Sequence, residues 1–312
     1  MFQKKVEAGT LAAWLIVAMS APFALLAGKF DWLGLAVAVV ITGVLCRLVT
    51  GLQIQNFSRV LCVVQFLFLG VLLAFLAEWS QDVWPTGRDF PVVPLTLLAL
   101  AVLSAYRGAH GASRVGGALF WFIAGLYGVL LVFGSRNLQI DFLRPAYDVP
   151  GAEALLVLLL PAVIQFIPRE TKTVLHSAVL WVGGLFVVLS LWTIGGLSRQ
   201  VASDAVWPFY EAGKSVSVLG IAERLEAFIS VAATIGCYGL FSLLISAMAH
   251  LAEGVHPGWG RYGAVAAGLV AAVILLFTPG IPVILLLLVA VILWGIVPFV
   301  SSLRFREKKK KK

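Results

Sequence analysis

Two interrupted apolar segments carry the residues of this chain that could bind a ligand. The first contains Ser20 and Pro22, and the second begins at Gly151 and Glu153 and continues through Pro161. Proline removes one helical hydrogen bond and leaves carbonyl groups one turn earlier without a partner. In lipid, such a break is tolerated where it is buried in protein or lines a cavity. The pattern predicts a small ligand site at the two breaks; the alternative is that both prolines only kink ordinary helices.

Two acidic residues are candidates for ligand binding. One adjoins the second interrupted segment, and the other lies at the start of a later apolar run. Glu153 opens the second interrupted segment, and a carboxylate at a helix N-terminus is stabilised by the exposed N–H groups. It either binds the amine or cation of a ligand or caps the helix. Glu226 follows Glu223 and Arg224. It either belongs to a charged helix start at the outer surface or faces the protein interior, where ionisable groups are costly and usually functional. The candidate ligand-binding residues are Ser20, Pro22, Gly151, Glu153 and Glu226.

Catalytic and metal-binding patterns are not expected from the remaining reactive side chains. The histidines map to the predicted cytoplasmic ends of apolar runs and comprise His110, His176, His250 and His256. The cysteines fall inside apolar runs without metal-ligand spacing and comprise Cys46, Cys62 and Cys237. We therefore expect no catalytic residue, no metal and no cofactor, and a protein that is not an enzyme.

Composition places these residues in a membrane. Of 312 residues, 61% are hydrophobic and only 12% are charged, which is too little polar surface for a soluble domain of this length. The charge-free runs predict ten transmembrane helices at about 8–27, 32–53, 58–77, 90–109, 113–135, 144–168, 174–198, 225–250, 260–278 and 282–303. The first run is long enough to be a retained span rather than a cleaved signal. Pro279, Gly280 and Pro282 divide the last charge-free stretch into two helices.

The distribution of positive charge predicts the orientation. With the N-terminus in the cytoplasm, the inner segments hold 16 of the 23 lysines and arginines, including the tail from Lys308 to Lys312. This bias favours cytoplasmic N- and C-termini. It also explains the net charge of +8 without nucleic acid as a partner, so membrane lipid is the expected environment.

The positions of the two breaks suggest an internal repeat. If ten helices form two halves of five, the first and sixth helices occupy equivalent places. Paired interrupted helices are typical of inverted-repeat transporters, in which the site lies near the bilayer midplane. The predicted fold is thus one all-α integral membrane domain, 1–312, with a 5+5, LeuT-like arrangement. The polar connection 199–224 is expected either on the membrane surface or over an outer vestibule.

Three stretches, in order, carry a resemblance to a known family. The first is TGRDFPVVPL at 86–95, continuing through YRGA at 106–109 to ASR at 112–114, and it is similar to "TP…GLETLAR". The second, GAEALL at 151–156, is similar to "GFExLL". The third comprises WPFYEA at 207–212, KSV at 214–216 and ERLEA at 223–227, and is similar to "P…E..R.I…ERLDAL". The set resembles the spore germinant-receptor B subunits, a spore-permease family of the amino acid–polyamine–organocation transporters.

The resemblance implies a function and a location. It implies a ten-helix fold in the inner membrane of an endospore or in a cell membrane, with an A-type membrane subunit and a lipid-anchored C-type subunit as partners. It further implies a small nutrient ligand, such as an amino acid, whose binding triggers germination. Three hypotheses stay open: a germinant sensor, a free-standing amino acid permease, and a membrane scaffold without a ligand site. A sensor and a transporter can share one fold, so the sequence does not separate them.

Overall fold

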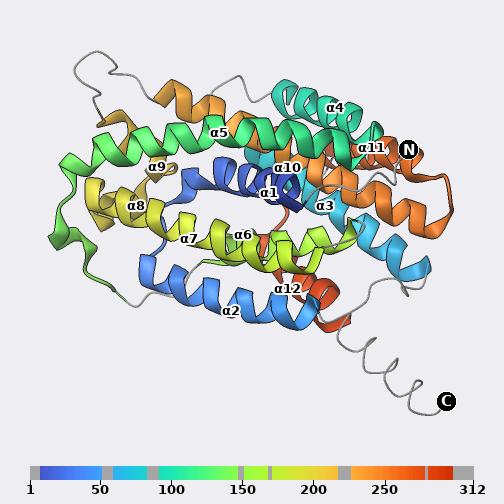
Figure 1. Cartoon of the computed structure of the whole chain (residues 1–312), viewed down its shortest axis with the longest axis horizontal. Helices are drawn as coiled ribbons and strands as arrows, with labels where there is room; N and C mark the ends of the chain where they lie inside the picture. Colours follow the sequence, from blue (N-terminus) through green and yellow to red (C-terminus); the bar gives the residue numbers. More distant parts are fainter. Residues whose placement is uncertain are drawn as a thin grey trace, which may run out of the picture.

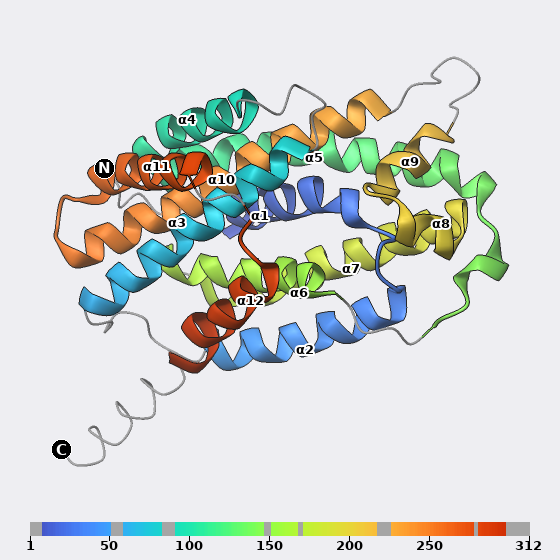
Figure 2. The same ribbon diagram turned by 180° about the vertical axis from the view of Figure 1, so that it is seen from behind.

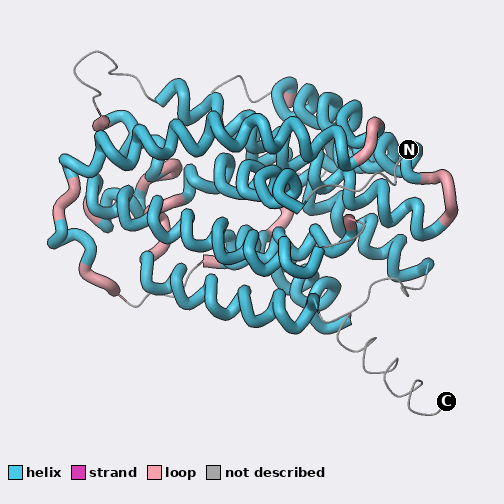
Figure 3. Tube along the Cα trace, viewed as in Figure 1, coloured by secondary structure: helices cyan, strands magenta, loops and turns pink. Residues whose placement is uncertain are grey.

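The chain forms a single bundle of helices that run mostly along its long axis (Figure 1). The computed structural model describes residues 8–50, 59–82, 91–146, 151–167, 171–216, 226–277 and 280–297. Within these ranges the structure contains helices, turns and loops and no strand (Figure 3). Apolar runs in lipid are expected to form α-helices, because a helix pairs the backbone N–H and C=O groups within one segment.

The α-helices follow the apolar runs of the sequence. They are α1 (Ala8–Phe23), α2 (Trp32–Thr50), α3 (Arg59–Asp82), α4 (Val92–Tyr106), α5 (Ala109–Gly134), α6 (Ala152–Leu159), α7 (Thr171–Leu197), α8 (Arg199–Asp204), α9 (Pro208–Lys214), α10 (Glu226–Val255), α11 (Gly260–Phe277) and α12 (Val283–Val291). Short 3₁₀ segments are η1 (Ala24–Leu26), η3 (Ser135–Asn137), η4 (Ile140–Leu143) and η5 (Leu160–Phe166), and η6 (Ile292–Ile296) is a π-helix.

The chain has the surface of an integral membrane protein. Among the described residues, six helices are long and apolar enough to cross a bilayer, and four shorter apolar helical segments accompany them. Large apolar side chains point outward along these helices: Trp121 is 74% exposed and Val40 is 66% exposed. Such a surface is unfavourable in water and suits lipid. The prediction of an all-helical membrane protein is confirmed.

Helix α1 lies inside the bundle. It packs against α5, α7 and α10, and most of its side chains are buried. The α9 end of the bundle is the end at which α8 and α9 lie, and the opposite end, where the N-terminus lies, is the N-terminal end (Figures 1 and 2). Helix α9 packs against α7, α10 and η1, so the described part of the connection 199–224, through residue 216, is folded onto the bundle.

Both segments with predicted breaks depart from α-helical geometry. Helix α1 contains Pro22 and gives way at Ala24 to the 3₁₀ segment η1. The sixth predicted helix, 144–168, begins only at Ala152, because its N-cap Gly151 has an extended backbone. It stays α-helical for 8 residues and then becomes the 3₁₀ segment η5, with Pro161 near its start. The residues just before Gly151 lie outside the described ranges.

The predicted helices 260–278 and 282–303 correspond to α11 and α12, which pack against different neighbours: α11 against α3, α4 and α10, and α12 against α6. Gly280, between them, has a φ of +86°, a conformation that costs glycine little. Its backbone N–H donates to the Glu78 carboxylate at 3.2 and 3.3 Å, which ties Gly280 to α3. Beyond it, α12 passes into the π-helix η6. The end of the predicted range 282–303 lies outside the described residues.

Candidate functional site

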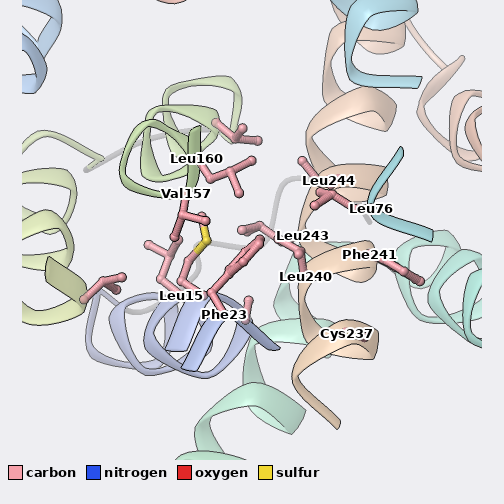
Figure 4. Close-up of a cluster of buried hydrophobic side chains, with 14 of the residues drawn as sticks. Leu15, Phe23, Leu76, Val157, Leu160, Cys237, Leu240, Phe241, Leu243 and Leu244 are labelled. Carbon is pink, nitrogen blue, oxygen red and sulfur yellow. The ribbon is translucent and has the colours of Figure 1, made fainter. Parts of the chain in front are cut away.

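The two interrupted helices meet in an apolar cluster (Figure 4). Side chains from α1, α6 and α10 converge there, and the cluster includes Leu15, Phe23, Val157, Leu160, Leu240 and Leu244. Each of these side chains is buried. These six side chains are apolar and offer no hydrogen bond to a polar ligand.

Ser20 and Pro22 are fixed by their neighbours in the bundle. The Ser20 hydroxyl donates to the carbonyl of Ile16, and the Ser20 carbonyl accepts a hydrogen bond from the Tyr127 hydroxyl at 3.0 Å. That carbonyl lies in the turn before Pro22, and Tyr127 on α5 is 5% exposed. Tyr127 thus gives α1 a hydrogen bond from α5, at a carbonyl two residues before Pro22. A lone tyrosine in the apolar run of α5 was the signal that could have identified it.

Pro22 packs against a glycine of α10. A Cβ built at Gly236 would lie 2.4 Å from Pro22 Cδ and 2.5 Å from Ala21 Cβ. The turn of α10 at Gly236 therefore approaches the turn of α1 at Pro22 closely, because Gly236 has no side chain. A second bond holds the same pair of helices: the indole N–H of Trp14 donates to the Gly239 carbonyl at 3.1 Å. The turn of α1 that contains Pro22 is thus in close contact with α10.

Gly151 and Glu153 lie at the beginning of α6 and pack towards the turn before α2. A Cβ at Gly151 would lie 2.5 Å from the ring of Phe30 and 2.8 Å from Glu153 Oε2. The close approach that glycine permits here is therefore to Phe30. Glu153 is exposed and lies in the first turn of α6, where the helix N-terminus favours a carboxylate.

The predicted site residues thus fall into separate surroundings. Ser20 and Pro22 face α5 and α10, whereas Gly151 and Glu153 face Phe30. Glu226 is the first residue of α10, and its side chain lies outside the described part of the structure, as do Glu223 and Arg224. A ligand site formed by these five residues stays a prediction.

Aromatic side chains close the α9 end above the apolar cluster. Phe23 stacks on Trp79 with ring centroids 5.4 Å apart, and Trp79 meets Trp207 edge-on at 5.2 Å. Phe209 of α9 is fully buried between Tyr127 and Trp192, at centroid distances of 5.8 and 5.4 Å. Edge-to-face and offset aromatic pairs stabilise such contacts beyond the area they bury. Helix α9 therefore seals this end of the bundle.

The polar interior of the described chain is small and nearly uncharged. Its buried residues include one charged side chain, Asp31, which accepts from the N–H of Leu33 at 3.3 Å and so caps α2. Two glutamines, Gln65 on α3 and Gln165 in η5, are buried with both amide atoms unpaired. Neither was identified as a candidate from the sequence, although each is the only amide in its apolar run.

Comparison with known proteins gives one structural and one sequence similarity. The fold is similar to that of Mhp1, a nucleobase-cation-symport-1 family transporter, in a closed conformation with bromovinylhydantoin bound. The TM-score is 0.56 with 13% sequence identity, and the similarity covers 93% of this chain and 76% of that one. The similarity shows the fold alone, which is that of a membrane transporter.

The sequence similarity covers a small part of a much larger protein. The chain is 28% identical over 216 residues to the calpain-type cysteine protease DEK1 of Arabidopsis thaliana, which covers 61% of this chain. The similar segment spans only 9% of the length of that relative. No protein-family model matches the chain. These comparisons describe an integral membrane protein with a transporter fold.

Proposed function

We propose that this protein is the membrane subunit of a spore germinant receptor, which binds a small nutrient such as an amino acid and signals through A-type and C-type partner subunits. The transporter fold with interruptions in both α1 and α6 is the observation that carries the proposal. The spore-specific part of it rests on the sequence resemblance at 86–114, 151–156 and 207–227.

The proposed architecture has ten membrane-crossing segments in a 5+5 arrangement. The six long helices and the four shorter apolar segments supply that number within the described residues. In this arrangement α1 and α6 hold equivalent places in the two halves, and both termini lie in the cytoplasm, in the spore inner membrane or a cell membrane. The α9 end is then the outer end.

The apolar cluster and the aromatic closure suggest how ligand binding would be signalled. A nutrient that binds between α1, α6 and α10 must separate side chains that now touch each other. A ligand shifts such an equilibrium only by its difference in affinity for the two states. Movement of one five-helix half against the other would pass the change to the partner subunits.

A peptidase activity is not part of the proposal. A nucleophilic cysteine needs access to substrate and a neighbouring base. The cysteines Cys46, Cys62 and Cys237 are 2%, 7% and 3% exposed and lie within helices. We infer that the chain is not an enzyme and that the similarity to a protease relative concerns a segment of membrane helices here.

A free-standing amino acid permease is the second candidate, and the transporter fold favours it. The two functions are separated by reconstituting the purified chain in liposomes, alone and with its A- and C-type partners. We expect the chain alone to give no saturable amino acid uptake and the complex to respond to nutrient by releasing trapped ions. Robust, saturable uptake by the chain alone would refute the sensor hypothesis and support the permease hypothesis. Absence of nutrient binding to either preparation would leave the scaffold hypothesis.

A further inference from the structure

Two buried residues with unpaired polar groups, Gln65 of α3 and Trp294 of η6, belong to two elements that touch each other away from the predicted site. Trp294 is 2% exposed, and its ring meets Phe68 of α3 edge-on at a centroid distance of 5.7 Å. Gln65 stands one helical turn before Phe68 on the same face of α3 and is fully buried. The indole N–H of Trp294 and both amide atoms of Gln65 have no hydrogen-bond partner.

Unpaired groups of this kind are costly in a protein interior. An amide without a hydrogen bond in an apolar environment costs about 1–3 kcal/mol by mutational measure, and proteins rarely keep one without a reason. Here an amide donor and an amide acceptor lie on α3, one helical turn from the residue that contacts Trp294, and an indole donor lies on Trp294 itself.

The backbone at this junction is itself unusual. Residues Ile292–Ile296 form a π-helix that interrupts the last apolar helical segment, and Trp294 is its central residue. A π-helical turn is rare and is frequently found at functional sites. The unpaired side chains and the π-helix are independent observations that point to the same place.

We propose that Gln65 and Trp294 form a binding site for a small uncharged molecule that carries a carboxamide or an equivalent adjacent donor and acceptor. The Gln65 amide matches such a group with two hydrogen bonds, and the Trp294 indole N–H donates to its carbonyl oxygen. An ionised ligand is disfavoured, because the one charged group among the buried described residues, Asp31, belongs to the cap of α2. The site is separate from the residues on which the proposed nutrient binding rests.

The test uses acetamide as the probe and 5-fluorotryptophan-labelled protein in nanodiscs. The fluorine resonance of Trp294 is assigned with Trp294→Phe. We expect acetamide to shift this resonance saturably, while acetate and glycine, which are similar in size but charged or zwitterionic, leave it in place. Gln65→Met, which keeps the side-chain length and removes the amide, should weaken the acetamide effect at least tenfold.

The matched control is Gln165→Met, because Gln165 is another buried, unpaired amide but belongs to η5. It should leave the acetamide response of Trp294 unchanged. If Gln65→Met protein does not fold, Gln65→Leu provides the same comparison, because it also removes the amide. The proposal is overturned if acetamide gives no saturable shift, if acetate or glycine shifts Trp294 equally, or if the response persists when Gln65 loses its amide. A nutrient-binding assay is not involved, so failure here leaves the receptor proposal standing.

Discussion

Gly236 lies where α10 crosses the proline of α1, and its missing side chain sets the distance between the two helices. The atoms that a Cβ would meet are Pro22 Cδ and Ala21 Cβ, which belong to a rigid ring and a one-carbon side chain and cannot rotate away. We expect Gly236→Ala to destabilise the protein by about 1–3 kcal/mol through overpacking. Thermal unfolding of the purified protein in detergent would measure the loss.

A control for this substitution exists on α5. Gly125 is an exposed helical glycine with no atom within 4 Å of an added Cβ. Gly125→Ala should therefore be neutral or stabilise the protein by up to about 1 kcal/mol, since alanine is the better helix former. Equal stability of the two variants would show that α1 and α10 do not approach as closely as described.

Glu226 is one of the residues predicted to bind the nutrient. If its carboxylate faces a ligand, Glu226→Gln should weaken the nutrient response of the reconstituted receptor, because the amide has no charge to pair with an amine. Glu211→Gln is the comparison, since Glu211 on α9 is a surface residue paired with Lys214 at 2.8 Å. An unchanged response of the Glu226 variant would reduce Glu226 to a helix-capping residue.

Among the elements, α9 has its largest buried side chain at Phe209. Phe209 is fully buried between the rings of Tyr127 and Trp192. Phe209→Ala should cost about 3–5 kcal/mol and release α9 from the bundle. Hydrogen exchange of residues 208–214 would report the release as faster exchange in that segment than in the wild type.

The matched comparison is Phe228→Ala on the neighbouring α10. Phe228 is 51% exposed on the apolar outer surface of the bundle. Its loss removes lipid contact rather than core packing, so exchange of 208–214 should stay at the wild-type rate. Protection of α9 that is unaffected by Phe209→Ala would mean that other contacts hold it.

At the scale of the whole molecule, the bundle has two ends that should face opposite sides of a membrane. Helix α8 lies at the α9 end and the α10–α11 connection at the N-terminal end (Figure 1). Cysteines placed at Ser203 and at His256, both exposed, should react with an impermeant reagent from outside and from inside, respectively. The native cysteines are buried and give little background. Labelling of both positions from the same side would refute the proposed orientation.

The helices were predictable because lipid imposes a simple pattern on the sequence. A charge within a membrane-spanning segment is costly, so charge-free runs mark where helices lie, and the division of the last run into two helices near Gly280 follows from its two prolines. An all-helical membrane protein with a transporter fold is confirmed by the structure and by its similarity to Mhp1. Helix ends were less predictable, as the late start of α6 at Ala152 shows.

The surroundings of the candidate site were not predictable, because they depend on contacts between distant segments. Nothing in the sequence near Gly151 indicates that the ring of Phe30 occupies the place next to it. Likewise, the local pattern around Pro22 does not reveal that Tyr127 pairs with the Ser20 carbonyl, 107 residues apart. Local residue patterns identify a break in a helix, and only the packing decides what fills it.

The enclosed position of α1 has a consequence for how the protein is made. This helix is synthesised before α10, yet the Trp14 indole bonds to Gly239, 225 residues later in the chain. It is apolar enough to be inserted in the bilayer as a single helix, and it then associates with its partner helices after they have been inserted. Contacts over such separations form slowly, so assembly should finish only after α10 has been inserted. A truncated chain that ends before α10 should expose α1 to lipid and be a target for membrane quality control.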